Sequence, residues 1–161
     1  MPSILFVCTA NQFRSPLAAA CLSKHLNTER TDGEWTVESA GTWAESGLSV
    51  PSVALKVADK LGLVGLDRHI TRQIDEKLLD QFNLIIVMEM GQKEALHSEF
   101  LSVRGRLYLL SEIVDGFCYD IADPAHLGVN PYEIGQEIYG LVTRGKTEIL
   151  QLARTTNKGA A

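Results

Sequence analysis

The segment VCTANQFRSP, residues 7–16, places a cysteine and an arginine at a spacing that suits phosphate chemistry. Cys8 is a nucleophile when its thiol is ionised, and the planar guanidinium of Arg14 can bind two oxygens of one phosphate group. Ser15 can donate its hydroxyl to the sulfur. The intervening loop can offer backbone N–H groups to the other oxygens, and it consists of Thr9, Ala10, Asn11, Gln12 and Phe13. The segment therefore predicts a nucleophile beside a phosphate-binding loop.

The Cys-x5-Arg spacing alone is weak evidence, because short motifs arise by chance and a free cysteine is more often a small buried hydrophobic residue. The elements expected around it strengthen the interpretation. Residues 3–7 predict a buried strand, and Ser15 and Pro16 suit the N-cap and the first position of a helix. Cys8 then lies between a strand end and a helix N-terminus. Unpaired N–H groups and the helix dipole favour a thiolate and a bound anion there.

The rest of the chain alternates between strand and helix patterns. Apolar runs predict further strands at 83–88 and 106–110, and alternation of polar and apolar residues predicts one at 34–39. Helical patterns predict helices between Pro51 and Gly62, around residues 91–100, and from Tyr132 to about Arg154. In the last of these, Gly135, Gly140 and Gly145 weaken the expectation of one unbroken helix. This order predicts a single α/β domain. Its parallel sheet is flanked by helices on both faces, and ligands bind beyond the carboxyl ends of the strands.

Composition excludes several classes of protein. The 161 residues are 45% hydrophobic and 22% charged, and a net charge of −5 argues against a nucleic-acid partner. We expect no membrane span and no signal peptide, because no apolar stretch is long enough and the N-terminus lacks a basic start. Three scattered cysteines fit neither a disulfide framework nor a zinc site, and His25, His97 and His126 have no ligand spacing. We expect a cytoplasmic protein without a metal.

Residues 7–16 resemble the phosphate-binding loop of the bacterial low-molecular-weight protein tyrosine phosphatases. Four more segments follow in that family's order: ESAGT at 38–42, DRHITRQI at 67–74, NLIIVMEM at 83–90 and DIADP at 120–124. The resemblance covers nearly the whole chain. It implies a four-stranded parallel sheet and metal-free, cofactor-free hydrolysis of phosphotyrosine through a cysteinyl-phosphate intermediate. The implied partner is a tyrosine-phosphorylated protein, such as a bacterial tyrosine kinase. We expect the domain to span 1–154 and the tail at 155–161 to be disordered.

The resemblance also implies which carboxylate acts as general acid and base. Asp123 matches the family's acid, which protonates the leaving oxygen and then activates water. Asp120 and Asp115 are the alternative candidates for this role. Asp123 is preferred because the proline that follows it matches the family pattern.

A hydrogen-bonded brace for the loop is implied in the same way. By resemblance, Asn11, Ser15, Ser39 and His69 hold the phosphate loop open, which is reasonable because N–H groups aimed at one point need support for a strained backbone. We expect Arg72 to make a structural ion pair.

Several positions depart from the family pattern. Ala10 replaces a usual glycine, and Gln12 stands where isoleucine is common and where relatives that prefer phosphoarginine have threonine. Phe13 replaces a second cysteine that can protect the nucleophile, and Cys21 is too distant to take that role. Ala125 replaces an aromatic wall of the pocket. We expect Trp43 to supply that wall.

Functions besides phosphotyrosine hydrolysis stay open. Within the hydrolases, these are a phosphoarginine phosphatase and a phosphatase for small aryl phosphates. A non-catalytic phosphate-binding module also stays open, although Cys8 and Asp123 are both present. Arsenate reduction on the same fold would need two further cysteines near residues 81–90, and none is there.

Overall fold

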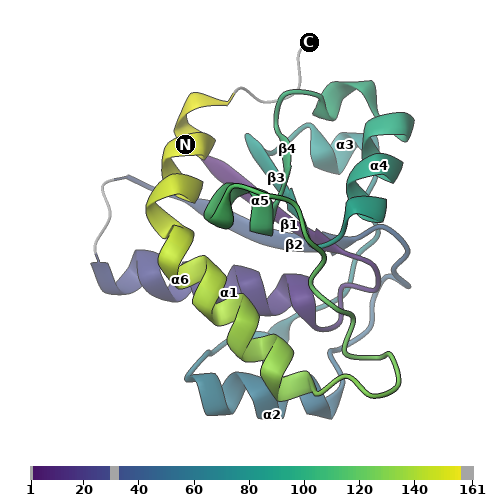
Figure 1. Ribbon diagram of the computed structural model, residues 1–161, viewed down its shortest axis with the longest axis vertical. Helices are drawn as coiled ribbons and strands as arrows, with labels where there is room; N and C mark the ends of the chain where they lie inside the picture. The colour runs from purple at the N-terminus through teal and green to yellow at the C-terminus, as the bar shows by residue number, and fades with distance from the viewer. Residues whose placement is uncertain (1, 30–32, 157–161) are drawn as a thin grey trace.

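A four-stranded parallel sheet forms the centre of the protein, which the computed structural model describes over residues 2–29 and 33–156 (Figure 1). The strands, in the spatial order β2-β1-β3-β4, are β1 (Ser3–Cys8), β2 (Thr36–Gly41), β3 (Leu84–Val87) and β4 (Leu107–Leu109). The helices are α1 (Arg14–Glu29), α2 (Ser52–Leu61), α3 (Glu76–Leu79), α4 (Met90–Glu99), α5 (Leu110–Asp115) and α6 (Pro131–Thr155), with 3-10 turns η1 (Leu66–Arg68) and η2 (Leu101–Val103). The predicted fold class is confirmed.

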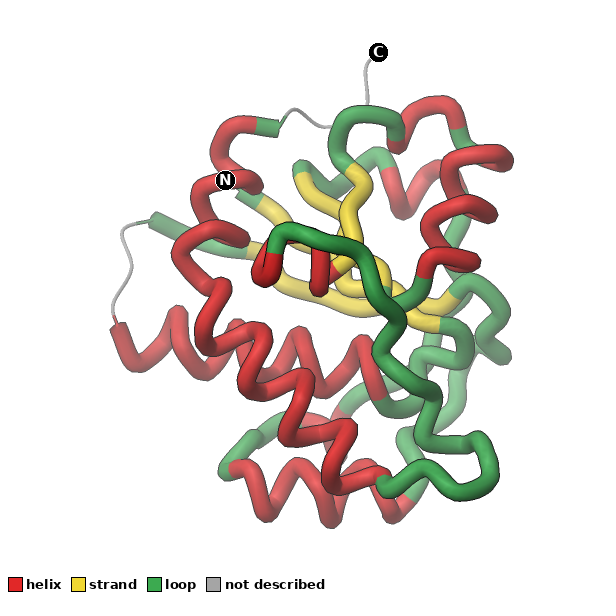
Figure 2. The backbone as a smooth tube through the Cα atoms, viewed as in Figure 1, coloured by secondary structure: helices red, strands yellow, loops and turns green. Residues whose placement is uncertain are grey.

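Helices cover both faces of this sheet, as Figure 2 shows. Successive residues of β1 point to opposite faces. Ile4 and Phe6 belong to the core formed with α1, α2, α5 and α6, whereas Leu5 and Val7 belong to the core formed with α3 and α4. All four side chains are buried, which explains why β1 is a continuous apolar run rather than an alternating one.

Helix α1 begins at Arg14, so the predicted N-cap at Ser15 is wrong. The backbone N–H of Leu17 donates to the carbonyl of Phe13 (3.0 Å), which places Phe13 at the start of the helix. Ser15 lies in the first turn, and its hydroxyl bonds the sulfur of Cys8. A hydroxyl that faces the sulfur is not available to cap the helix.

Strand boundaries differ from the predicted ones by one or two residues. β2 covers Thr36–Gly41 instead of 34–39, while β3 and β4 lie inside their predicted ranges. β1 extends to Cys8, which pairs with Gly41 across the sheet. The carboxyl ends of the two strands therefore meet beside the phosphate loop.

Helix α6 runs unbroken through the three glycines that weaken its prediction from sequence. A Cβ atom at Gly135 would collide with Val57 of α2, and one at Gly145 would collide with Val114 of α5. Close packing on both neighbours thus outweighs the low helix propensity of glycine. The predicted tail begins inside α6 at Thr155, and residues 157–161 lie outside the described residues. None of the helices in the described ranges has the length and apolar character to cross a bilayer.

Candidate active site

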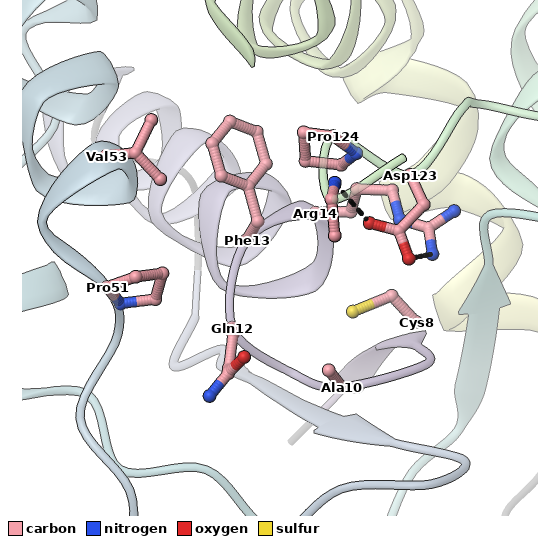
Figure 3. Close-up of a pocket in the computed structure, with 10 residues that line it drawn as sticks. Cys8, Ala10, Gln12, Phe13, Arg14, Pro51, Val53, Asp123 and Pro124 are labelled. Atoms are coloured by element: carbon pink, nitrogen blue, oxygen red, sulfur yellow. Dashed lines mark hydrogen bonds and ion pairs between the residues drawn. The ribbon is translucent and has the colours of Figure 1, made fainter. Parts of the chain in front are cut away.

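The loop between β1 and α1 forms the base of a pocket (Figure 3). Cys8, Ala10, Gln12 and Arg14 line this pocket, and the side chain of Cys8 is 3% exposed. Its Sγ lies 3.0 Å from the hydroxyl oxygen of Ser15. A hydroxyl in this position can donate to a thiolate and stabilise it.

Asn11 is the centre of the brace behind the loop. It is fully buried, and it is the one non-glycine residue in the described part of the chain with a positive φ, 59°. Its amide nitrogen donates to the hydroxyls of Ser15 (2.9 Å) and Ser39 (3.0 Å). Its amide oxygen accepts from the backbone N–H of Arg72 (3.0 Å). Asparagine tolerates the left-handed region better than most residues, and these bonds hold it there.

His69 holds the same residue from its backbone side. The Nε2 atom of His69 lies 3.0 Å from the carbonyl oxygen of Asn11, so the ring donates through Nε2–H. Burial lowers the pKa of His69 below its usual value, and the positive charge of nearby Arg72 lowers the pKa further. The hydrogen bond to Asn11 acts in the opposite direction and raises the pKa, but by less than burial lowers it. The neutral ring is therefore favoured. The structure brings the four predicted brace residues, Asn11, Ser15, Ser39 and His69, into one network.

Arg72 forms an ion pair with Glu38 (2.6 Å) and donates through Nε to the carbonyl of Ser39 (3.0 Å). It does not line the Cys8 pocket. This arrangement agrees with the structural role expected from the sequence.

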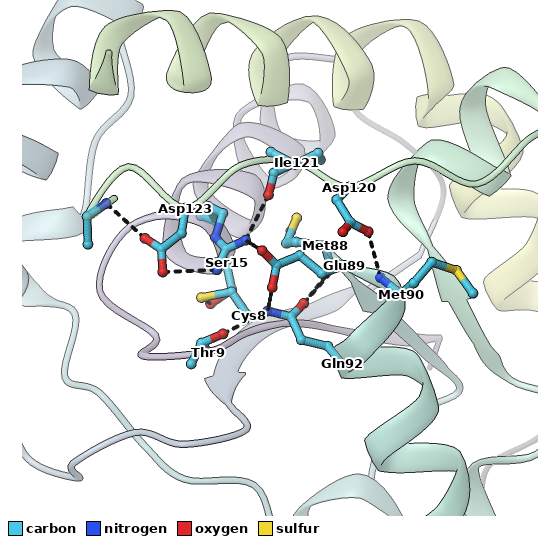
Figure 4. Close-up of polar contacts among 12 residues, drawn as sticks. Cys8, Thr9, Ser15, Met88, Glu89, Met90, Gln92, Asp120, Ile121 and Asp123 are labelled. Carbon is cyan, nitrogen blue, oxygen red and sulfur yellow. Dashed lines mark hydrogen bonds and ion pairs between the residues drawn. The ribbon is translucent and has the colours of Figure 1, made fainter. Parts of the chain in front are cut away.

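Three oxygen groups surround the guanidinium of Arg14, and they belong to Ile121, Glu89 and Asp123, which Figure 4 labels. Nη1 donates to the carbonyl of Ile121 (2.8 Å) and forms an ion pair with Glu89 (2.9 Å), and Nη2 faces the carboxylate of Asp123 at 3.4 Å. The side chain is 2% exposed, so the cation has little water around it. Two carboxylates and a carbonyl compensate this buried charge.

Asp123 and its two rivals lie in different surroundings. Asp123 lines the pocket, and its Oδ1 accepts from the N–H of Ala125 (2.9 Å). Asp120 accepts from the N–H of Met90 (2.8 Å) at the start of α4 (Figure 4). Asp115 bonds Tyr119 and Arg144, whose contacts lower the pKa of its carboxyl. Only Asp123 of the three lines the pocket that contains Cys8.

One side of the pocket is apolar. Phe13 points between Val53 and Pro124 in Figure 3, and Pro51 and Ala125 complete the lining. The pocket volume is about 130 Å³. The structure places Trp43 outside this lining, in an adjacent hollow beside Gln12. The aromatic wall expected from Trp43 is thus formed by Phe13.

Two polar residues that order the site, Glu89 and Gln92, are absent from the residues predicted from sequence. Gln92 is buried, its amide nitrogen donates to the hydroxyl of Thr9 (3.0 Å), and its amide oxygen accepts from the N–H groups of Met88 (2.9 Å) and Glu89 (3.0 Å). A signal for Glu89 exists in the sequence, because it follows β3, whose carboxyl end lies at the same sheet edge as Cys8. A charged residue directly after a buried central strand belongs among the candidates.

Two further features bear on the expected chemistry. Cys8, Cys21 and Cys118 are free thiols, and burial raises the pKa of Cys21 to about 11. Within residues 2–29 and 33–156, no group of three His, Cys, Asp or Glu side chains is placed to hold a metal ion.

A thiol, a buried guanidinium and a carboxylate around one strand-to-helix loop define a cysteine-dependent phosphatase site. The family follows from comparison with known proteins. Residues 3–157 match the family described as low molecular weight phosphotyrosine protein phosphatase, and the chain belongs to that family.

Relatives of this chain are named for two different substrates, and solved structures share its fold. The protein-arginine-phosphatase of Bacillus subtilis (strain 168) is 31% identical over 131 residues, which cover 81% of this chain and 84% of that protein. The low molecular weight protein-tyrosine-phosphatase Wzb of Escherichia coli (strain K12) is 35% identical over 122 residues, 76% of this chain and 77% of that protein. The crystal structure of YfkJ from Bacillus subtilis aligns with a TM-score of 0.84 at 27% identity, covering 94% of this chain and 96% of that one.

Proposed function

We propose that this protein hydrolyses phosphotyrosine in proteins. The observation that carries the proposal is one pocket with Cys8 and Arg14 at its base, Asp123 at its edge and an apolar wall that includes Phe13. The partner we propose is a tyrosine-phosphorylated protein, and the cytoplasmic location remains a prediction from composition.

The first step transfers the phosphoryl group to sulfur. The thiolate of Cys8 attacks phosphorus, the S–P bond forms, and the P–O bond to the tyrosine oxygen breaks. Asp123 gives its proton to that oxygen, so that tyrosine leaves as a neutral phenol. Arg14 and the N–H groups of the loop hold the negative charge of the other oxygens through the transition state.

The second step returns the enzyme to its starting state. The Asp123 carboxylate takes a proton from a water molecule, whose oxygen attacks phosphorus as the S–P bond breaks. Inorganic phosphate and the Cys8 thiolate result. The hydroxyl of Ser15, 3.0 Å from the sulfur, stabilises the departing thiolate.

The shape and polarity of the pocket support an aryl group as the part of the substrate next to the phosphate. Its volume of about 130 Å³ is close to that of the cavities of about 150 Å³ that bind benzene. Phe13 and Pro124 can face a phenyl ring, because aromatic rings gain from offset or edge contacts with each other and from apolar burial.

Phosphoarginine is the second candidate substrate, and two observations favour it. Relatives named protein-arginine-phosphatase match at 31% and 33% identity. Gln12 lines the pocket and carries an amide oxygen, which can accept a hydrogen bond from a substrate guanidinium. Hydrolysis of small aryl phosphates, and phosphate binding without turnover, are less specific candidates that the same pocket would serve.

The test is phosphate release from phosphotyrosine, phosphoarginine and phosphoserine peptides of one sequence, with EDTA present. Wild type is compared with Cys8→Ser and with Cys118→Ser, which removes an exposed cysteine outside the pocket. We expect turnover led by phosphotyrosine, lost in Cys8→Ser and kept in Cys118→Ser. Turnover led by phosphoarginine would move the assignment to the second candidate. Phosphate binding without turnover on any peptide would indicate a binding module.

A further inference from the structure

A groove separate from the Cys8 pocket lies between α1, β2 and the segment around η1. Its volume is about 410 Å³, compared with about 130 Å³ for the Cys8 pocket, and no residue lines both. Its lining includes Ser39, His69 and Arg72, which contact Asn11. The groove therefore lies on the side of the phosphate loop where the brace is, and a ligand bound in it would leave the Cys8 pocket open.

Strand β2 forms one wall of this groove and is an edge strand of the sheet. β1 pairs with one side of β2 only, so alternate residues of β2 direct their backbone N–H and C=O groups to the other side. Gly41 identifies these residues, because its N–H donates to the carbonyl of Arg72 (2.9 Å) and its carbonyl accepts from the N–H of Ile74 (2.9 Å). Val37 and Ser39 are in the same alternate positions as Gly41, so their backbone groups point to the same free side.

These outward backbone groups are only partly occupied. The carbonyl of Ser39 accepts from Nε of Arg72 (3.0 Å). Within residues 2–29 and 33–156, the N–H of Ser39 and both backbone groups of Val37 have no hydrogen-bond partner. Unpaired groups at a sheet edge are the template on which an extended segment adds as a further strand. The groove thus offers main-chain partners to such a segment.

The side chains around this edge indicate the chemistry of the segment. Arg72 is paired with Glu38 (2.6 Å), the one carboxylate of the lining. Arg68 also lines the groove, is exposed, and forms no ion pair with any residue that the structure describes. Val64 and Ile70 are 83% and 54% exposed and add large apolar side chains to the same lining. An unpaired cation beside apolar side chains suits a ligand that is both acidic and apolar.

We propose that this groove binds an acidic, extended segment of a partner protein, which adds as a strand to the free side of β2. The outward backbone groups of Val37 and Ser39 pair with its main chain. A carboxylate of the segment faces Arg68, and apolar side chains that alternate with the acidic ones cover Val64 and Ile70. The proposal goes beyond the proposed function, because it involves no catalytic residue and no phosphorylated substrate.

The probe is the capped hexapeptide Glu-Val-Glu-Val-Glu-Val, titrated into the whole protein at low salt by isothermal titration calorimetry. We expect it to bind at least about tenfold more tightly than Lys-Val-Lys-Val-Lys-Val, although the net charge of −5 on the chain attracts the lysine peptide in general. A Glu-Val peptide with methylated backbone nitrogens cannot donate to the carbonyl of Val37. It should bind at least about tenfold more weakly than the unmethylated peptide.

Two variants locate the binding. Arg68→Gln should weaken the Glu-Val peptide about fivefold, whereas the matched control Arg104→Gln, at an exposed arginine outside the groove, should leave its affinity unchanged. Val37→Pro removes the outward N–H and should weaken the peptide about tenfold. Proline is tolerated at such a position of an edge strand, because the N–H is not part of the ladder to β1. Urea unfolding checks that Val37→Pro is folded, and Arg68→Gln and the methylated peptide decide if it is not.

The outcomes identify what occupies the groove. Saturating inorganic phosphate at constant ionic strength should leave the affinity of the peptide unchanged, and competition would place the peptide in the Cys8 pocket and overturn the proposal. Absence of binding, equal binding of the glutamate and lysine peptides, or full affinity in Arg68→Gln would overturn it as well. A dimer in sedimentation that Val37→Pro dissociates would assign the groove to a second copy of the chain instead. None of these results depends on turnover, so they leave the proposed function to its own test.

Discussion

Replacing Asn11 should weaken both the folded state and phosphate binding, because this one buried side chain forms hydrogen bonds to three separate parts of the chain. It donates to Ser15 in α1 and to Ser39 in β2, and it accepts from the backbone of Arg72. Each bond joins the phosphate loop to a different part of the chain. Without them the loop keeps its sequence but loses the supports that aim its N–H groups at one point.

The size of the effect follows from these contacts. A neutral buried hydrogen bond contributes about 1 kcal/mol net, so losing three costs about 3 kcal/mol of unfolding free energy. Alanine at a φ of 59° adds the strain of the left-handed region, about 1 kcal/mol, which glycine avoids. We therefore expect Asn11→Ala to lose about 4 kcal/mol and Asn11→Gly about 3 kcal/mol. A loop displaced by about 1 Å should lower kcat/KM by about 100-fold in both variants.

Urea unfolding and kcat/KM on one substrate measure the two effects in the same protein samples. Asn27→Ala is the control, because Asn27 is exposed on α1, and we expect it to change stability by less than about 0.5 kcal/mol. A loss below about 1 kcal/mol in Asn11→Ala would refute the hydrogen-bond argument. Equal losses in the alanine and glycine variants would refute the backbone argument. Lost stability with full activity would show that the brace serves only folding.

Three further predictions concern the pocket and the brace. Asp123→Asn should lower kcat about 100-fold for alkyl phosphates and much less for nitrophenyl phosphate, because the nitrophenolate leaves without being protonated. Equal losses on the two substrates would point to another proton donor. Phe13→Ala should reduce kcat/KM for aryl phosphates about tenfold more than for alkyl phosphates, and equal losses would remove Phe13 from the aryl wall. Burial lowers the pKa of His69 from 6.5, so the unfolded chain takes up this proton first as the pH falls. The stability from neutral His69 should be present above about pH 6.5 and lost below it as the pH approaches the lowered pKa. Urea unfolding at about pH 7.5 and about 5.5 should therefore show a larger loss for wild type than for His69→Gln, and parallel losses would contradict this.

Elements that depend on local patterns are predictable from the sequence. Buried strands such as β1 and β3 are visible as apolar runs. The end of α2 is visible as Gly62, because glycine readily adopts the positive φ, here 70°, that ends many helices. The beginning of α1 is not predictable from the sequence. Ser15 suits an N-cap by its local sequence, and only the fold brings its hydroxyl to the sulfur of Cys8. The same holds for α6, where the contact of Gly145 with Val114 is not visible in the sequence.

The site is predictable to the extent that its residues are close in the chain. Cys8 and Arg14 share one loop, so their proximity follows from spacing alone. The contact between Arg14 and Glu89 joins the start of α1 to the segment after β3, and these lie far apart in sequence, so it becomes visible only once the order of the strands in the sheet is known. The prediction placed Trp43 in the wrong cavity because the path of residues 42–48 depends on close packing at Gly41 and on hydrogen bonds to the carbonyls of Cys8 and Thr9.

The guanidinium of Arg14 is in contact with two carboxylates before any phosphate arrives, one on Glu89 and one on Asp123. An incoming phosphate therefore competes with an anion that belongs to the protein, and its affinity is the difference between the two contacts. Inorganic phosphate, released after each turnover, faces the same rival. Because Glu89 and Asp123 already face Arg14, the unliganded site is not a bare cation, and this weakens the binding of inorganic phosphate.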